Sequence, residues 1–204
     1  MDASTLHGSP PRLLALDLAS ASGVCWARVG ETPRFLTVKF TREGEAASID
    51  GCWEAAARVI QWAADFTKVE QIDRVVIEAP IPERALGFST NAWSTMLKFF
   101  IIGTMGGALK CRGITVRDAN IGAVRTHVLG RGFGHAKKEI AKPAVMRVCK
   151  ALGWKPANFD EADAAALFLF DSFRVAPGLA HRCDPISLGI APLQREGPKR
   201  RARA

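Results

Sequence analysis

The chain contains 204 residues, of which 48% are hydrophobic, and it carries a formal net charge of +8. A chain of this length and apolar content can bury one full core, so an intrinsically disordered protein is excluded. The charge is concentrated in two places: residues 125–150 hold seven Lys or Arg against one Glu, and residues 195–204 hold five against one. This pattern indicates a face that binds a polyanion and a basic tail, although a solvated Lys-rich helix face has the same composition.

The cysteines and the terminal residues indicate the compartment. The five cysteines are odd in number and far apart, and neither a CxxC pair nor a His/Cys cluster suggests zinc. We therefore expect reduced thiols in a cytoplasmic protein rather than a disulfide framework. The first residues lack the pattern of a signal peptide, and the most apolar stretch, residues 99–109, is too short to span a bilayer.

The first half of the chain predicts three strands followed by a helix. Residues 1–11 are small and polar and are expected to form a flexible start. Strands are predicted at residues 12–17, 24–29 and 34–40, the first two joined by a turn at residues 20–23. A helix is predicted from residue 46 to about residue 67, because apolar residues recur there at three- and four-residue steps. Its apolar residues in that phase are Ile49, Trp53, Ala56, Ile60 and Ala63.

The second half predicts two further strands and four helices. The strands are expected at residues 74–78 and 114–116 and the helices at 92–111, 121–129, from near Pro143, and from Asp160. The helix at 92–111 is apolar nearly all round, which predicts a central, tightly packed position. Residues 12–176 are expected to form an α/β domain, a five-stranded mixed sheet flanked by helices, and residues 177–204 an irregular basic tail.

Four acidic residues stand at the edges of apolar elements. Asp17 and Glu78 end two predicted strands, while Asp160 and Asp163 share one face of the first turn of the last helix. An isolated Asp after a strand is often a turn residue, and N-capping accounts for Asp160. N-capping does not account for Asp163, which lies in phase with apolar residues of the same helix. Carboxylates gathered in one cleft repel one another unless divalent ions such as Mg²⁺ or Mn²⁺ neutralise them.

The order of these elements and motifs resembles RuvC-type Holliday-junction resolvases of the RNase H-like superfamily. The resemblance rests on Leu14–Asp17 with Gly23, on Val76–Glu78, on Val124-Arg125, on residues 130–138, and on Asp160–Ala164. It covers roughly residues 12–175. The Gly- and Lys-rich loop at 130–138 and the helix end Ala151-Leu152-Gly153-Trp154 are similar to those of the phage- or prophage-encoded branch.

The resemblance implies an RNase H-like fold and two-metal hydrolysis. Two Mg²⁺ ions, for which Mn²⁺ can substitute, would be held by Asp17, Glu78, Asp160 and Asp163. One ion would activate the attacking water and the other would stabilise the leaving oxygen. Glu161 is an alternative to Asp160 as the peripheral ligand. Lys138 is similar to a basic residue near the family's scissile phosphate, and its charge would neutralise that phosphate.

The basic residues and the loop at 81–91 are candidate DNA contacts. Backbone contacts, which give affinity without reading bases, are expected from Arg125, Arg131, Lys137, Lys138, Lys142 and Lys150. Gly130, Gly132 and Gly134 would let backbone amides approach phosphate. Phe88 either stacks at the junction centre or folds under the next helix. Trp93 is expected in the core or at a dimer surface, and His135 either touches phosphate or lies on the surface.

The function predicted from these features is a homodimeric endonuclease that resolves four-way DNA junctions by paired nicks. Its two-fold symmetry would match that of the junction, and the helix at residues 92–111 is the expected dimer element. The alternatives are a ribonuclease acting on RNA–DNA hybrids and a non-catalytic junction-binding protein. An actin-like ATPase would need a second half that this chain lacks. No nucleotide cofactor is expected, because no phosphate-binding P-loop is present, and no membrane partner is expected, because the most apolar stretch is too short to span a bilayer.

Overall fold

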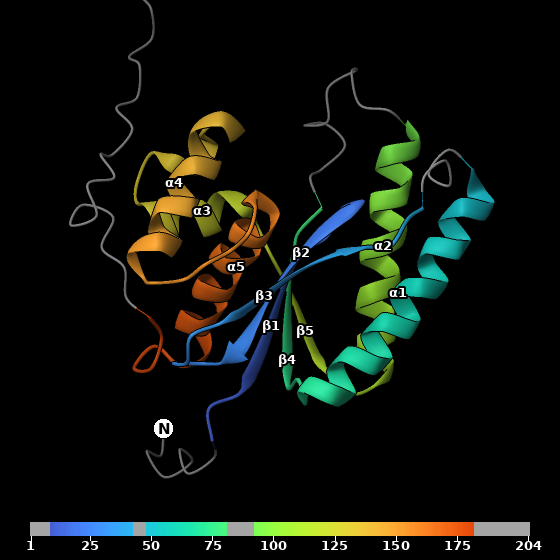
Figure 1. Cartoon of the computed structure of the whole chain (residues 1–204), viewed down its shortest axis with the longest axis horizontal. Coiled ribbons are helices and arrows are strands. Elements are labelled where there is room, and N and C mark those ends of the chain that lie inside the picture. Colours follow the sequence, from blue (N-terminus) through green and yellow to red (C-terminus); the bar gives the residue numbers. More distant parts are fainter. Residues whose placement is uncertain (1–8, 43–47, 81–91, 182–204) are drawn as a thin grey trace, which may run out of the picture.

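The computed structural model describes residues 9–42, 48–80 and 92–181 as an α/β domain in three layers. A twisted sheet lies in the middle, helices α1 and α2 cover one face, and α3, α4 and α5 cover the other (Figure 1). Two clusters of buried hydrophobic residues fill the two spaces between the layers. Among the described residues, no helix is both long enough and apolar enough to cross a membrane.

The five-stranded mixed sheet expected from the sequence is confirmed, with strand order β3-β2-β1-β4-β5. Strand β1 pairs antiparallel with β2 and β2 with β3, whereas β1 with β4 and β4 with β5 are parallel pairs. The strands are β1 (Arg12–Asp17), β2 (Ala21–Arg28), β3 (Arg34–Lys39), β4 (Arg74–Glu78) and β5 (Thr115–Ala119). The turn predicted at residues 20–23 is wrong: Ser22 and Gly23 already belong to β2, and the turn ends at Ser20.

The register places four site-forming residues on one face of the sheet. Asp17 is paired with Gly23, and Gly23 is paired with Thr37, so these three form one row across β1, β2 and β3. Glu78 follows Ile77, the partner of Leu16, and therefore continues the row on β4. Because side chains alternate along a strand, Asp17, Thr37 and Glu78 lie on the face toward α5, the side of the buried residues Ala15, Cys25 and Val76, and Gly23 leaves this face bare between them.

Helix α1 (Ile49–Glu70) begins where Ser48 accepts a hydrogen bond from the amide of Gly51. The apolar phase expected from the sequence is wrong for Ile49, Trp53 and Ile60, which are exposed, Trp53 to 59%, whereas Ala63 is buried as expected. The buried face of α1 carries Cys52, Ala55, Val59 and Ala63. Next to it, Phe66 contacts Trp26 of β2 and Trp62 contacts Phe40, so large aromatic side chains of α1 also pack against the sheet side.

Helix α5 (Phe159–Val175), and not α2 (Ala92–Cys111), is the central helix of the fold. The predicted central position of α2 is wrong, because it buries only one stripe: Leu97, Ile101, Met105 and Leu109. In α5 every residue from Glu161 to Leu169 is buried. The cause is position: α5 lies on the sheet and is covered in turn by α3 and α4 (Figure 1), whereas α2 is an outer helix.

Helix α3 (Ile121–Leu129) lies as expected, and the 3-10 helix η3 (Phe133–His135) connects it to α4 (Lys138–Ala151). The expected start of α4 near Pro143 is wrong, since the carbonyl of Lys137 already accepts the amides of Ile140 and Ala141. At its position in the second turn Pro143 removes only one helical hydrogen bond. The predicted flexible start and basic tail lie almost entirely outside the described residues.

Candidate metal and nucleic-acid site

Asp17 and Glu78 lie side by side at the ends of two parallel neighbouring strands. Both follow buried apolar runs, and the parallel pairing of β1 with β4 brings the two ends to the same edge. Burial raises the pKa of Asp17 well above its usual value, and the charge of Glu78, a hydrogen bond shared with it, and the charge of Asp163 raise it further. Holding Asp17 charged here therefore costs free energy, as is typical of functional carboxylates.

Asp160 and Asp163 reach the same edge from the first turn of α5. The helix starts at Asn158, whose side chain accepts hydrogen bonds from the amides of Asp160 and Glu161. Lys142 of α4 lies between the two aspartates, with Nζ 3.1 Å from Oδ1 of Asp160 and 3.5 Å from Oδ2 of Asp163. The structure thus brings Asp163 toward Asp17 and Glu78, and links Asp160 to them through Lys142.

Gly23 permits this close approach of α5 to the sheet. A Cβ atom at Gly23 would lie 2.0 Å from the carbonyl oxygen of Asp160 and 2.7 Å from the amide nitrogen of Glu161. Such distances are well inside van der Waals contact with backbone atoms, which cannot rotate away. Any side chain at this position would therefore lift the first turn of α5, and Asp163 with it, away from Asp17.

Asp17, Glu78, Asp160 and Asp163 form an acidic cluster, whose charge is partly balanced by three cations: Lys98, Lys142 and Arg125. The Nζ atom of Lys98 on α2 lies 3.9 Å from Oε1 of Glu78, and its charge lowers the pKa of Asp17. Burial raises the pKa of Asp163, an effect that the charges of Lys142 and Arg125 oppose and that of Glu78 reinforces, so the net pKa is raised. Sequence reasoning missed Lys98. Its signal was a single charged residue in the otherwise apolar segment from Ala92 to Leu109.

The carboxylates do not form a preassembled metal-binding cage. Within the described ranges, no three Asp, Glu, His or Cys side chains are grouped closely enough to hold an ion. Lys142 is bound to both Asp160 and Asp163, and burial, which would lower the pKa of Lys142, is outweighed by its hydrogen bond to Asp160 and by the charges of Asp163, Asp160 and Asp17. The arrangement as it stands is an acidic cluster organised around ammonium groups.

Glu161, the alternative to Asp160 as a peripheral ligand, points away from the cluster. Its Oε1 accepts a hydrogen bond from the hydroxyl of Thr37 at 2.7 Å, and its Oε2 accepts one from the amide of Ala157 at 2.7 Å. The side chain is buried, with 5% exposure. Both oxygens are therefore occupied, one by a donor of β3 and the other by a donor of the loop before α5, whereas Asp160 faces Lys142.

Lys138 lies one helical turn before Lys142 on α4, and its side chain is exposed. In the described part of the chain no ion pair joins Lys138 to the acidic residues, so the cation beside them is Lys142. Arg131, Lys137 and Lys150 are exposed as well. Arg125 is partly buried and donates from Nη1 to the carbonyl of Ala136 at 3.1 Å, which fastens the glycine-rich loop to α3.

The glycines of residues 130–134 have conformational and packing roles in the fold. Gly130 and Gly132 have φ values of 90° and 98°, a region that other residues rarely adopt. At Gly134 a Cβ would lie 2.8 Å from Oγ1 of Thr126 on α3. A cavity of about 560 Å³ lies beside this contact, with His127 and His135 among its lining residues. Phe88 lies outside the described residues, and Trp93 is partly exposed on α2.

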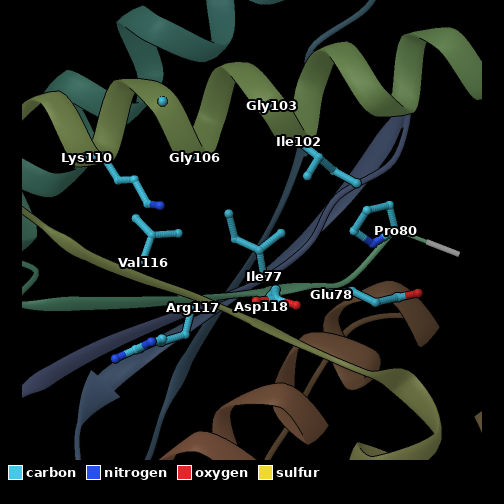
Figure 2. Close-up of a pocket in the computed structure, with 11 residues that line it drawn as sticks. Ile77, Glu78, Pro80, Ile102, Gly103, Gly106, Lys110, Val116, Arg117 and Asp118 are labelled. Atoms are coloured by element: carbon cyan, nitrogen blue, oxygen red, sulfur yellow. The ribbon is translucent and has the colours of Figure 1, made fainter. Parts of the chain in front are cut away.

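A groove of about 410 Å³ leads away from Glu78 between α2 and strands β4 and β5. Figure 2 shows Glu78 and Pro80 at one end and Lys110 at the other, with Gly103 and Gly106 of α2 facing the groove. A Cβ at Gly103, Gly106 or Gly107 would meet no atom within 4 Å. The uncovered face of α2 is therefore open next to the candidate site.

Comparison with solved structures identifies the fold. The RuvC structure of Thermus thermophilus superposes with a TM-score of 0.59 at 21% identity, covering 83% of this chain and 98% of that chain. The same protein in complex with Holliday junction substrate gives 0.59 at 22% identity, again covering 83% and 98%. The yeast mitochondrial Holliday junction resolvase Ydc2 gives 0.54 at 13% identity, covering 79% and 78%. No protein-family model and no curated protein sequence matches the chain. The chain has the RNase H-like fold that these Holliday junction resolvases share.

Proposed function

We propose that the protein is a metal-dependent endodeoxyribonuclease that resolves four-way DNA junctions. The observation that carries the proposal is the convergence of Asp17, Glu78 and Asp163 from β1, β4 and α5 at one sheet edge. The same fold in proteins described as Holliday junction resolvases, one of them in complex with junction substrate, supports the choice of substrate. A fold alone does not identify a substrate, because function resides in the residues of the site.

The acidic cluster fits a divalent cation. Its donors are carboxylate oxygens, the hard ligands that Mg²⁺ and Mn²⁺ prefer. Burial raises the pKa of Asp17 and of Asp163, and the charge of Glu78 raises both further, so a bound cation would relieve the cost of keeping these carboxylates charged. Asp17, Glu78, Asp160 and Asp163 would hold two Mg²⁺ ions, which supply the activated water and stabilise the leaving oxygen. Lys142 would have to release Asp160 and Asp163 to the metal.

The cations around the cluster would bind the sugar–phosphate backbone. Lys142, which lies beside Asp160 and Asp163, would neutralise the charge of a phosphate bound at the cluster. Lys138 is one turn further out and would contact the same strand, together with Arg131, Lys137 and Lys150. Arg125, tied to Ala136, would contribute by holding the loop and by its charge near Asp163. Contacts of this kind make affinity fall steeply with salt.

Paired nicking requires two sites related by a two-fold axis, which a homodimer supplies. The open face of α2 is the surface that fits a second copy. It carries Phe99, which is 43% exposed, and three glycines that leave room for a close approach of helices. Its groove adjoins Glu78, so a partner seated there would lie next to the acidic cluster.

The proposal is tested by cleavage of a labelled mobile four-way junction with Mg²⁺, using the wild type and the Asp163→Asn variant. Flap and RNA–DNA hybrid substrates are tested in parallel. We expect symmetric paired nicks in the junction from the wild type, and binding without cutting from the variant. Unchanged cutting by the variant would remove the acidic cluster from the mechanism. Preferred cutting of the hybrid would identify a ribonuclease instead.

A further inference from the structure

A second set of polar side chains lies beside the acidic cluster and takes no part in the proposed chemistry. Thr37 on β3 is in the same sheet row as Gly23 and Asp17. Its hydroxyl donates to Oε1 of Glu161 at 2.7 Å and accepts from Nδ2 of Asn158 at 2.7 Å. One strand hydroxyl thus holds both the N-cap residue of α5 and the third residue of its first turn.

Three further hydrogen bonds of the same network are made by Glu161 and Asn158 at the start of α5. Oε2 of Glu161 accepts the amide of Ala157 at 2.7 Å, and Oδ1 of Asn158 accepts the amides of Asp160 and Glu161 at 3.1 and 2.9 Å. The first turn of α5 is therefore bound to β3 on one side and to the preceding loop on the other. Charge-assisted hydrogen bonds to a buried carboxylate are strong and directional.

The geometry of the turn connects this network to the acidic cluster. Successive residues of an α-helix are about 100° apart, so Glu161 and Asp163 project in nearly opposite directions. Glu161 points along the row toward Thr37, the carbonyl of Asp160 rests on Gly23, and Asp163 points toward Asp17 and Glu78. The hydrogen bond of Glu161 to β3 therefore fixes the rotation of α5 about its own axis. That rotation directs Asp163 toward Asp17, at the opposite end of the row from Thr37.

We propose that Thr37, Asn158 and Glu161 are positioning residues that set the rotation of α5 and so give the acidic cluster its affinity for divalent metal. This inference rests on the proposed function, because it concerns the metal that the cluster would hold. It assigns Glu161 to the support of the site and not to the ligand set. The sequence had left Glu161 as an alternative ligand, and none of its motifs pointed to Thr37.

The test uses Thr37→Val, which keeps the shape and removes the hydroxyl, and Thr37→Ser, which restores it. The matched control is Thr67→Val, because Thr67 on α1 donates its hydroxyl to Ala63 at 2.6 Å far from the cluster. Mn²⁺ binding is measured by calorimetry at a temperature well below every Tm. We expect Thr37→Val to weaken Mn²⁺ binding about 10-fold, as loss of supporting residues does at metal sites, and Thr37→Ser and Thr67→Val to bind as the wild type does.

Amide hydrogen exchange of the metal-free protein gives a second readout. Thr37→Val should speed exchange of the first-turn amides of α5 relative to Thr67→Val. Wild-type metal affinity in Thr37→Val would overturn the inference, and tighter binding would show that Glu161, once freed, is itself a ligand. Should the wild type bind no Mn²⁺, the proposed function fails as well. If Asp163→Asn loses Mn²⁺ binding while Thr37→Val keeps it, only the positioning role is refuted.

Discussion

The two ends of α5 each place aspartate against the sheet, with opposite energetic consequences. Near its C-terminal end, Asp171 is fully buried, and Arg74 of β4 meets it with two hydrogen bonds of 2.6 and 3.0 Å. At the N-terminal end, Asp163 shares Lys142 with Asp160 and is repelled by Glu78. A buried acid with its own arginine has its charge compensated, so that removing the arginine destabilises the fold, whereas buried acids that repel one another are typical of functional sites.

The Arg74–Asp171 pair provides the largest expected effect on stability. Arg74→Met should cost about 3–5 kcal/mol of unfolding free energy, because it leaves the carboxylate of Asp171 buried without a partner. Urea unfolding measures the loss. The control is Arg34→Met, which breaks an exposed pair with Glu70 at 3.1 Å and should cost no more than about 1 kcal/mol. Equal losses in the two variants would contradict a structural role for the buried pair.

Gly23→Ala tests whether the position of the N-terminal end of α5 depends on its contact with β2. The added Cβ would overlap the carbonyl of Asp160, so we expect a loss of about 1–3 kcal/mol and a displaced α5 start. Gly107→Ala serves as the control, since a Cβ there meets no atom within 4 Å and the helix gains from the substitution. Urea unfolding measures the stability of both variants, and calorimetry measures their affinity for Mn²⁺. Only Gly23→Ala should lose both stability and metal affinity.

Asp17→Asn should change stability by a smaller amount and in the opposite direction, making the metal-free protein more stable. The raised pKa of Asp17, caused first by burial and then by Glu78, means that its charge is costly at neutral pH. Removing that charge should raise the unfolding free energy of the metal-free protein by about 0.5–2 kcal/mol, as at other functional sites. Thermal unfolding at pH 7 with a chelator measures the difference. A lower Tm for the variant would mean that the charge of Asp17 is already balanced without metal.

The part of the fold that the sequence predicts well is the part set by local pattern. Strands β1 and β4 and helix α3 have the expected bounds, because continuous apolar runs and clear breaks define them. The phase of α1 was wrong in part, because Trp53 and Ile60 are exposed although Ala63 is buried as expected. The start of α4 was wrong because Pro143 is tolerated in the second turn. The apolar periodicity of a segment predicts that it is helical, but it does not predict which element the helix packs against.

The same limit applies to the candidate site. Asp17 and Glu78 end buried strands, and that feature is visible in the sequence. Lys98, Lys142 and Thr37 act through pairing between elements far apart in the chain, which no local spacing shows. Only the register that places Thr37 beside Gly23 and Asp17 reveals that β3 supports the acidic residues.

The most direct test of the difference between the two ends of α5 is a calorimetric titration of Mn²⁺ into Asp163→Asn and Asp171→Asn. Both variants carry the same substitution on the same helix, and both are measured below their Tm. We expect Asp163→Asn to lose Mn²⁺ binding, and Asp171→Asn to bind Mn²⁺ as the wild type does although it is less stable. Wild-type binding by Asp163→Asn would contradict the metal site at the N-terminal end of α5.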